Sequence, residues 1–179
     1  MSNVNSPNGF TPAYHMSGGT IRPSEFAIAS GTNASIFSGD VVNLSSGLVI
    51  QGTATGVPLG VFGGVEYQAT DGSVVFSKVW TADVATLGAA NAKAYVYSDP
   101  DIVYEAQSTG TPTQASIGTT NTISTTAGDS NTGRSKEGVT TTTSSGIATV
   151  VGFVDRPDNA IGQYARVYVI FPASVFGNN

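Results

Sequence analysis

Residues 93–106 of this 179-residue chain read KAYVYSDPDIVYEA and contain two short β-patterns around a turn. Lys93–Tyr97 and Ile102–Ala106 are rich in tyrosine and β-branched residues, which favour strands. Ser98–Asp101 is typical of a turn, because Pro fixes φ and Asp accepts local backbone hydrogen bonds. The pattern predicts a hairpin with a four-residue loop.

Short β-patterns separated by Gly, Ser, Asn and Asp turns continue on both sides of this stretch. They lie at 26–29, 35–37, 41–44, 48–50, 58–67, 74–80, 147–154 and 164–171. In the last of them Val167, Val169 and Phe171 alternate with Arg166 and Tyr168, so we expect one buried face. About ten short strands predict an all-β single domain, built either as a sandwich or as a barrel.

One window, residues 81–92, departs from the β-pattern. It reads TADVATLGAANA, in which Ala favours helix and Asp83 suits a helix start. We expect one or two helical turns here, although Gly88 weakens the pattern.

Residues 1–24 form a separate region, an extended arm that precedes the all-β domain of residues 25–179. Three prolines oppose regular ladders and helices within it, yet it carries more apolar side chains than a disordered tail. We therefore interpret the arm as a docking segment; the alternative is a tail folded back over its own domain. The candidate contact residues for a capsid or for another copy are Phe10, Tyr14, Met16, Ile21 and Arg22.

Residues 108–146 form a polar excursion within the domain. Ser and Thr supply 20 of its 39 residues, and only four residues are charged. We expect a long loop, with thin exposed strands near Asn121–Thr125, because Thr favours β-structure. Such a segment has little to hold it in a lone monomer and would be ordered by packing against neighbouring copies.

The composition of the chain limits the classes of molecule that it is expected to bind. Charged residues make up 11% of the chain, the net charge is −5, and the seven Lys and Arg residues form no basic stripe. We therefore expect no nucleic-acid partner, and no apolar run is long enough for a membrane span. No signal peptide is visible. A surface of Thr, Ser, Asn and Gly suits side-by-side packing in an assembly, and the alternative is a small secreted or surface-exposed β-domain.

The sequence contains few combinations of residues that could catalyse a reaction. His15 is the only histidine, and a Ser-His-Asp triad would have to recruit it. Without cysteine, Cys-His catalysis and thiolate metal sites are excluded. The carboxylate pairs Asp99 with Asp101 and Asp155 with Asp158 could serve glycoside hydrolysis, but both stand beside prolines, where Asp favours turns. We predict no catalytic residue, no cofactor and no metal ligand. The aromatic residues are expected in the core, with a sugar-binding platform as the alternative.

Seven stretches spread over nearly the whole chain stand out as a set. They are Asn8–Pro12 (NGFTP), Ser17–Arg22 (SGGTIR), Ile36–Val42 (IFSGDVV), Val75–Trp80 (VFSKVW), Ala94–Pro100 (AYVYSDP), Asn131–Ser135 (NTGRS) and Pro157–Asn159 (PDN). Together they resemble small capsid cement (decoration) proteins of tailed bacteriophages and cyanophages, and the Gly-Asp-Val-Val element resembles decoration domains of the β-tulip kind. The resemblance implies a protein on the outer surface of the virion head that forms homotrimers, or sometimes dimers, and clamps neighbouring major capsid protein subunits.

Three hypotheses follow. The first is a non-enzymatic cement protein that binds the major capsid protein and itself. The second is a tail or fibre-associated structural protein that binds host-surface carbohydrate. The third is a virion-associated polysaccharide depolymerase that uses Asp155 and Asp158.

Overall fold

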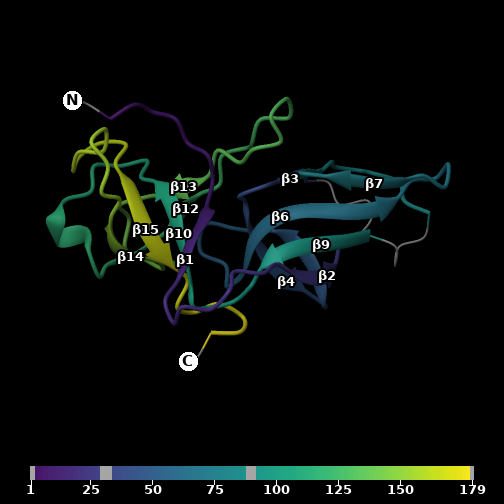
Figure 1. Cartoon of the computed structure of the whole chain (residues 1–179), viewed down its shortest axis with the longest axis horizontal. Helices are drawn as coiled ribbons and strands as arrows, with labels where there is room; N and C mark the ends of the chain where they lie inside the picture. Colours follow the sequence, from purple (N-terminus) through teal and green to yellow (C-terminus); the bar gives the residue numbers. More distant parts are fainter. Residues whose placement is uncertain (1–2, 29–33, 88–91, 178–179) are drawn as a thin grey trace.

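The computed structural model describes residues 3–28, 34–87 and 92–177. Almost all regular structure in this part of the chain is β, arranged as antiparallel sheets of which none closes into a barrel, so the fold is sandwich-like. Figure 1 shows the two main sheets side by side along the long axis. The prediction of an all-β fold is therefore confirmed, and the sandwich, not the barrel, is the architecture observed.

The first sheet has five strands in the order β1-β10-β15-β14-β11. They are β1 (Thr11–His15), β10 (Ile102–Gln107), β15 (Arg166–Ile170), β14 (Ala148–Phe153) and β11 (Thr120–Asn121). The alternation predicted for the last strand is confirmed, because Val167 and Val169 are buried while Arg166 and Tyr168 are only partly covered. This sheet covers a core that includes Phe10, Tyr104 and Phe171.

The second sheet has six strands, in the order β2-β9-β6-β4-β5 with β7 paired to the far end of β6. They are β2 (Ser24–Ala27), β9 (Ala92–Tyr97), β6 (Pro58–Gln68), β4 (Val41–Ser45), β5 (Leu48–Gln51) and β7 (Val74–Ser77). The sheet curls until Ile28 and Val49 meet in a single parallel bridge. It encloses its own core, built around Trp80, Phe62 and Leu59.

Two short strand pairs and one 3₁₀ turn complete the regular structure. The pairs are β3 (Ile36–Phe37) with β8 (Val79–Trp80) and β12 (Ile123–Ser124) with β13 (Gly138–Val139), and the turn η1 spans Gln114–Ser116. The two cores meet at β4, because Val41 faces the first core and the next residue, Val42, faces the second. Period-two alternation along one strand thus serves both halves of the fold.

The predicted hairpin at residues 93–106 is wrong. Both strands exist, but β9 pairs with β2 and β6, whereas β10 pairs with β1 and β15. The turn between them is instead the crossover from the second sheet to the first. One contact still joins the two strands, since the buried hydroxyl of Tyr104 donates to the carbonyl oxygen of Tyr97 at 2.8 Å.

The predicted helix at 81–92 is not found in the described part of that window, residues 81–87; Gly88–Asn91 lie outside the described residues, and Ala92 begins β9. Asp83 has φ +59°, which is incompatible with a right-handed helix. Thr86 bridges to Ala69, and Leu87 N–H donates to the carbonyl oxygen of Gln68 at 2.9 Å. The segment therefore makes a turn at Ala82–Asp83 and then places Thr86 and Leu87 beside the end of β6.

The polar excursion is packed against its own domain. Ile123 and Val139 are buried in the first core. The hydroxyl groups of Thr122 and Thr140 lie 2.7 Å apart, and Thr122 N–H donates to the carbonyl oxygen of Thr142 at 2.9 Å. The expectation that these strands are exposed and lack support in a lone chain is therefore wrong, because hydroxyl and backbone pairs satisfy the segment internally.

Candidate contact surface

The segment that the sequence marks as an arm crosses the middle of the molecule in the view of Figure 1, where it contributes β1 to the first sheet and leads into β2 of the second. Residues 11–15 form β1 at the edge of the first sheet, and residues 24–27 form β2 at the edge of the second. The folded-back arrangement is thus the one observed. Since β1 pairs only with β10 among the described strands, its outer edge faces away from the sheet.

The five candidate contact residues occupy different environments. Phe10 is 1% exposed, and its ring centroid lies 5.4 Å from that of Phe171. Phe10 is therefore a core residue with no surface to offer a partner. Tyr14 and Met16 are 43% and 58% exposed. Ile21 is half-buried against the first core and Arg22 is exposed; the contact role of these four residues stays a prediction.

The edge strand β1 has features that govern how a partner could approach it. Its register with β10 shifts between Pro12 and Tyr14, which marks a bulge. Proline removes one backbone donor and a bulge twists the edge, so open-ended strand pairing is restrained. Tyr14 packs edge-on against Tyr168 of β15, with ring centroids 5.4 Å apart. The exposed Tyr14 ring is therefore held in place by its contact with Tyr168.

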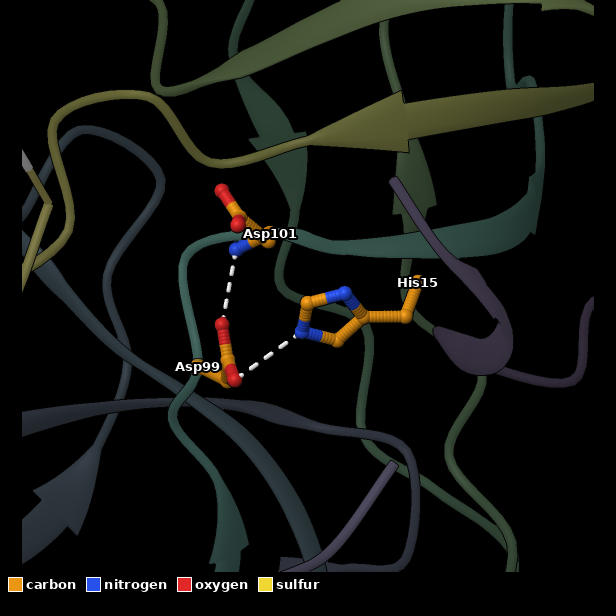
Figure 2. Close-up of side chains that lie close together, drawn as sticks. All are labelled: His15, Asp99 and Asp101. Carbon is orange, nitrogen blue, oxygen red and sulfur yellow. Dashed lines mark hydrogen bonds and ion pairs between the residues drawn. The ribbon is translucent and has the colours of Figure 1, made fainter. Parts of the chain in front are cut away.

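The turn after β1 is fastened to the crossover between the sheets by His15. Its Nε2 lies 3.1 Å from Oδ2 of Asp99, and Met16 N–H donates to the carbonyl oxygen of Asp101 at 2.9 Å. Figure 2 shows the ring pointing into the bend formed by Asp99 and Asp101. The pKa of Asp99 is lowered by the hydrogen bond from Asp101 N–H and then by the contact with His15.

The hydrogen bonds on Nδ1 of His15 define what this cluster can do. Ser17 N–H and Gly19 N–H both donate to Nδ1, each at 3.3 Å. Nδ1 is therefore an acceptor, and Nε2 carries the proton that it donates to Asp99.

Ligand atoms of His15, Asp99 and Asp101 lie within 4.8 Å of one another, close enough to surround a metal ion. A metal on Nε2 would force the ring proton onto Nδ1, against two N–H donors. This geometry favours a structural clamp over a metal site.

Ser17, His15 and Asp99 also form a chain of the Ser-His-Asp type, since Ser17 Oγ lies 3.0 Å from Nδ1. Ser17 is exposed, and it stands only two positions from His15 within one turn. The lone pair that would take its proton already accepts two backbone N–H groups, which weakens Nδ1 as a general base. The contact is explained by the local turn.

An open groove of about 560 Å³ lies between the second half of the arm and the crossover. Its lining consists of Thr20, Arg22, Ser24, Phe26, Ser98, Asp99, Pro100 and Phe176. Phe26 and Phe176 stack with ring centroids 6.1 Å apart, and Phe176 is exposed. The groove therefore combines an aromatic face with a cation and a carboxylate. Asp155 and Asp158, the other predicted carboxylate pair, lie exposed in a turn.

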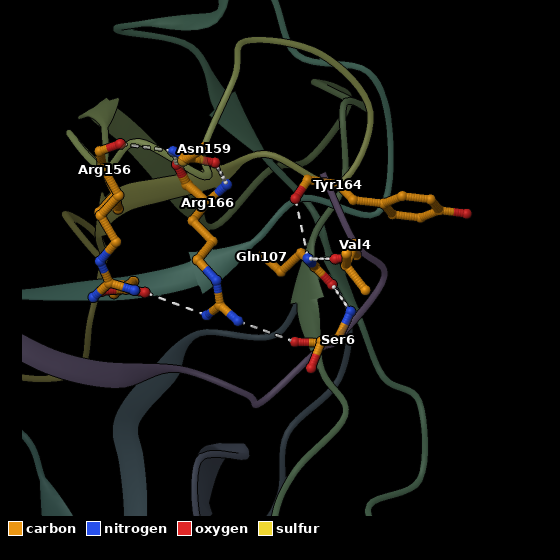
Figure 3. A network of polar contacts seen from close by, with 9 residues as sticks. Val4, Ser6, Gln107, Arg156, Asn159, Tyr164 and Arg166 are labelled. Carbon is orange, nitrogen blue, oxygen red and sulfur yellow. Dashed lines mark hydrogen bonds and ion pairs between the residues drawn. The ribbon is translucent and has the colours of Figure 1, made fainter. Parts of the chain in front are cut away.

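The start of the described chain is held by polar contacts alone, shown in Figure 3. Gln107 Nε2 donates to the carbonyl oxygens of Val4 and Tyr164 at 2.8 and 3.0 Å, and its Oε1 accepts from Ser6 N–H at 2.9 Å. Arg166 contacts the carbonyl oxygen of Ser6 at 3.3 Å and Glu105 at 3.2 Å. A buried glutamine thus fastens the first residues to the first sheet.

One further polar feature, the buried carboxyl groups of Asp40 and Glu137, was not predicted from the sequence. Both side chains are 1% exposed. In the sequence Glu137 follows Lys136 and looks like a surface charge. Only its place two positions before the apolar Val139, on the same side of an extended chain, could have suggested otherwise.

Comparison with known proteins gives no assignment: no protein-family model, curated protein or solved structure matches this chain. No helix in the described ranges is long and apolar enough to cross a membrane.

Proposed function

We propose that this chain is a non-enzymatic structural protein of a tailed-phage particle, a capsid cement protein that oligomerises and bridges major capsid protein subunits on the outer surface of the head. The observation that carries the proposal is the placement of exposed Tyr14 on edge strand β1 and of exposed Met16 in the turn that follows it, next to the His15–Asp99 clamp. Aromatic and Met side chains on a rigid base are typical anchors of protein interfaces.

The chemistry of the surface supports an assembly role. With 11% charged residues, few ions need to be desolvated when copies pack side by side. Many weak contacts repeated over a shell add up to firm attachment without any single strong site. A trimer is the favoured assembly and a dimer the alternative; nucleic acid and membrane are not proposed as partners.

Attachment to phage heads tests the proposal. Purified protein is mixed with expanded heads of a phage that encodes it, from which the cement layer has been removed, and bound protein is measured after sedimentation. We expect Tyr14→Ser combined with Met16→Ser to reduce binding at least tenfold. Phe76→Ser is the matched control, because Phe76 is 72% exposed on β7, in the other sheet. Equal binding by the double variant and the wild type would contradict the assignment of this surface, and absence of wild-type binding would refute the function.

The solution mass provides a second test of the same proposal. Light scattering is expected to show a trimer or a dimer. A monomer that also fails to bind heads would exclude the cement function.

A lack of enzymatic activity is part of the proposal and is tested separately. The Ser17–His15–Asp99 chain is the arrangement closest to a catalytic one on this surface, so hydrolysis of a chromogenic acetyl ester is the relevant assay. We expect the wild type and Ser17→Ala to match the buffer rate. Turnover that disappears in Ser17→Ala would show an esterase.

A tail or fibre-associated protein that binds host-surface carbohydrate is the second candidate. The groove between Arg22, Asp99 and Phe176 favours it, because sugar rings stack on aromatic faces while their hydroxyls pair with charged groups. A glycan array on the wild type and on Phe176→Ala tests this candidate. Binding that depends on Phe176 would support it over the cement function.

A further inference from the structure

Two buried carboxyl groups meet where three segments of the chain join. Asp40 lies in the turn between β3 and β4, and Glu137 lies in the polar excursion just before β13. The third segment is Gly9–Phe10, which leads into β1. We propose that Asp40 and Glu137 together carry at most one negative charge at neutral pH, and that the proton they retain keeps residues 133–139 docked at the junction of the two sheets by preventing a second buried charge.

Each carboxyl group has one oxygen engaged and one without a partner. Glu137 Oε2 accepts from Val41 N–H at 2.8 Å, and Asp40 Oδ2 accepts from Phe37 N–H at 2.8 Å. Asp40 Oδ1 and Glu137 Oε1 are buried and have no hydrogen-bond partner within the described residues. An unpartnered carboxylate oxygen is costly to bury, whereas a protonated oxygen is neutral and becomes a donor.

No cation among the residues that the structure describes forms an ion pair with either carboxyl group. The ion pairs found in the described ranges involve neither Asp40 nor Glu137. The nearest basic residues along the docked segment are Arg134 and Lys136; Arg134 is exposed, and Lys136 contacts Asp129 at 3.8 Å. Lys78, beside Gly133, is also exposed.

Because neither carboxyl group has a cationic partner among the described residues, no ion pair offsets the effect of burial on their pKa values. Burial, and then the charge of Asp40, raises the pKa of Glu137 to about 9. Burial also raises the pKa of Asp40, although the nearby Ser135 hydroxyl and the hydrogen bond from Phe37 N–H act in the opposite direction. Two interacting carboxyl groups of this kind do not ionise independently.

The pair stands among the backbone contacts that dock the excursion. Ser135 N–H donates to the carbonyl oxygen of Ser38 at 3.0 Å, and Ser38 N–H donates to that of Gly133 at 3.2 Å. Phe10 N–H donates to the carbonyl oxygen of Gly39 at 2.9 Å. A second negative charge in this place would repel Glu137 from Asp40 and loosen residues 133–139 first.

A buried divalent cation is the competing occupant. Calcium takes six to eight oxygen ligands and magnesium about six. The described residues offer two unpartnered carboxyl oxygens here, and both residues are 1% exposed, which leaves little room for the waters that would complete a shell. A proton on one of the carboxyl groups removes a buried charge without further ligands.

Carboxyl carbon NMR on the unmodified protein tests the proposal directly. We expect the Glu137 carboxyl signal to stay at its protonated position from pH 5 to pH 7 and to titrate above pH 8. A Glu137 signal that titrates near the ordinary value of 4.5 would overturn the proposal. Amide exchange of Ser135, corrected for intrinsic rates, is expected to accelerate at least tenfold between pH 7 and pH 10, whereas that of Val167 in β15 stays constant; equal changes at both positions would contradict local release.

Thermal unfolding of variants distinguishes the effect of the Glu137 proton on stability from the effects of other titrating groups. Between pH 4.5 and 9 the unfolded chain has released the Glu137 proton that the folded chain retains, so stability falls as pH rises and levels off above pH 9. We expect the melting temperature of the wild type to fall by about 10 °C between pH 6 and pH 9. Glu137→Gln should remove this fall, and Glu25→Gln, an exposed control in β2, should retain it.

Parallel slopes for the wild type and Glu137→Gln would overturn the proposal. A stabilisation by millimolar calcium that Glu137→Gln abolishes would also overturn it and would show a cation site. These measurements use the isolated protein, so their outcome is independent of whether it attaches to phage heads.

Discussion

The Nε2 of His15 lies 3.1 Å from Oδ2 of Asp99, which ties the turn at the end of β1 to the crossover between the two sheets. The two residues are 84 positions apart. The contact places the arm on the domain and gives Tyr14 and Met16 their firm base. The surface proposed for docking therefore depends on a pair of residues that takes no part in the docking itself.

Removal of either partner should weaken this clamp. His15→Ala is expected to destabilise the protein by about 1 kcal/mol, the usual net value of one such hydrogen bond. Asp99→Asn should have a similar effect, and the double variant should show less than the sum of the two. Urea unfolding of the four proteins measures the coupling; strictly additive effects would show that the contact contributes nothing.

The clamp also has a predictable dependence on acid. Because the pKa of Asp99 is lowered in the folded protein, its stabilising contribution is present above its ordinary pKa of 3.8 and is lost as the pH falls through the lowered value. We expect the difference in stability between the wild type and Asp99→Asn to shrink below pH 4. An unchanged difference at pH 2.5 would contradict this origin.

Phe10 is expected to act as a core residue. Phe10→Ala should cost about 3–5 kcal/mol because it leaves a cavity against Phe171. Phe76→Ala, on the exposed face of β7, should stay within about 0.5 kcal/mol of the wild type. The free energy of unfolding measures both variants, and equal effects would contradict the burial of Phe10.

Gly9 should be intolerant of any side chain. It has φ +68°, and a Cβ at this position would overlap Ser135 and lie 2.7 Å from the carbonyl oxygen of Gly39. Gly9→Ala is expected to cost roughly 3 kcal/mol. Gly18→Ala is the matched control, because Gly18 has φ +75° with open space around it, so only the backbone strain of about 1 kcal/mol applies. A similar loss in both variants would show that the contact with Ser135 is unimportant.

Gln107 is expected to hold the first residues in place. Gln107→Ala removes three hydrogen bonds from buried positions and should cost about 2 kcal/mol. Limited proteolysis is the sharper readout, since cleavage near Val4–Ser6 should precede cleavage elsewhere. Gln114→Ala, an exposed control in η1, should leave the digestion pattern unchanged.

Local sequence patterns predicted the strands well but not their partners. Alternation of Val167 and Val169 identified β15, since period two is a local property. The partners of β9 and β10 depend on strands far away in sequence, and a short turn with Asp and Pro suits a crossover as well as a hairpin. The prediction for the excursion was wrong for a related reason. Ser and Thr residues are usually expected on the surface, but the hydroxyl groups of Thr122 and Thr140 form a hydrogen bond with each other.

The candidate contact residues and the buried carboxyl pair were predicted unevenly. Tyr14, Met16 and Arg22 are exposed, as a contact role requires. Apolar residues such as Tyr14 and Met16 stand out in a proline-rich segment, so they can be selected from the sequence alone. Phe10 gives the same signal although it lies in the core, since sequence does not distinguish an anchor for a partner from an anchor for the chain itself. The Asp40–Glu137 pair gave no signal, because only the fold brings residues 97 positions apart together.

The fastening of the first residues has a consequence for synthesis. Asn3 is held by Ala160 and Gln163, and β1 cannot pair until β10 has emerged from the ribosome. The first described residues are therefore without these partners until residues 160–163 have been translated. Contacts of such long range slow folding and leave edges open to other molecules in the meantime. The apolar side chains of this segment, Phe10 and Tyr14 among them, are therefore open to unwanted contacts during that time.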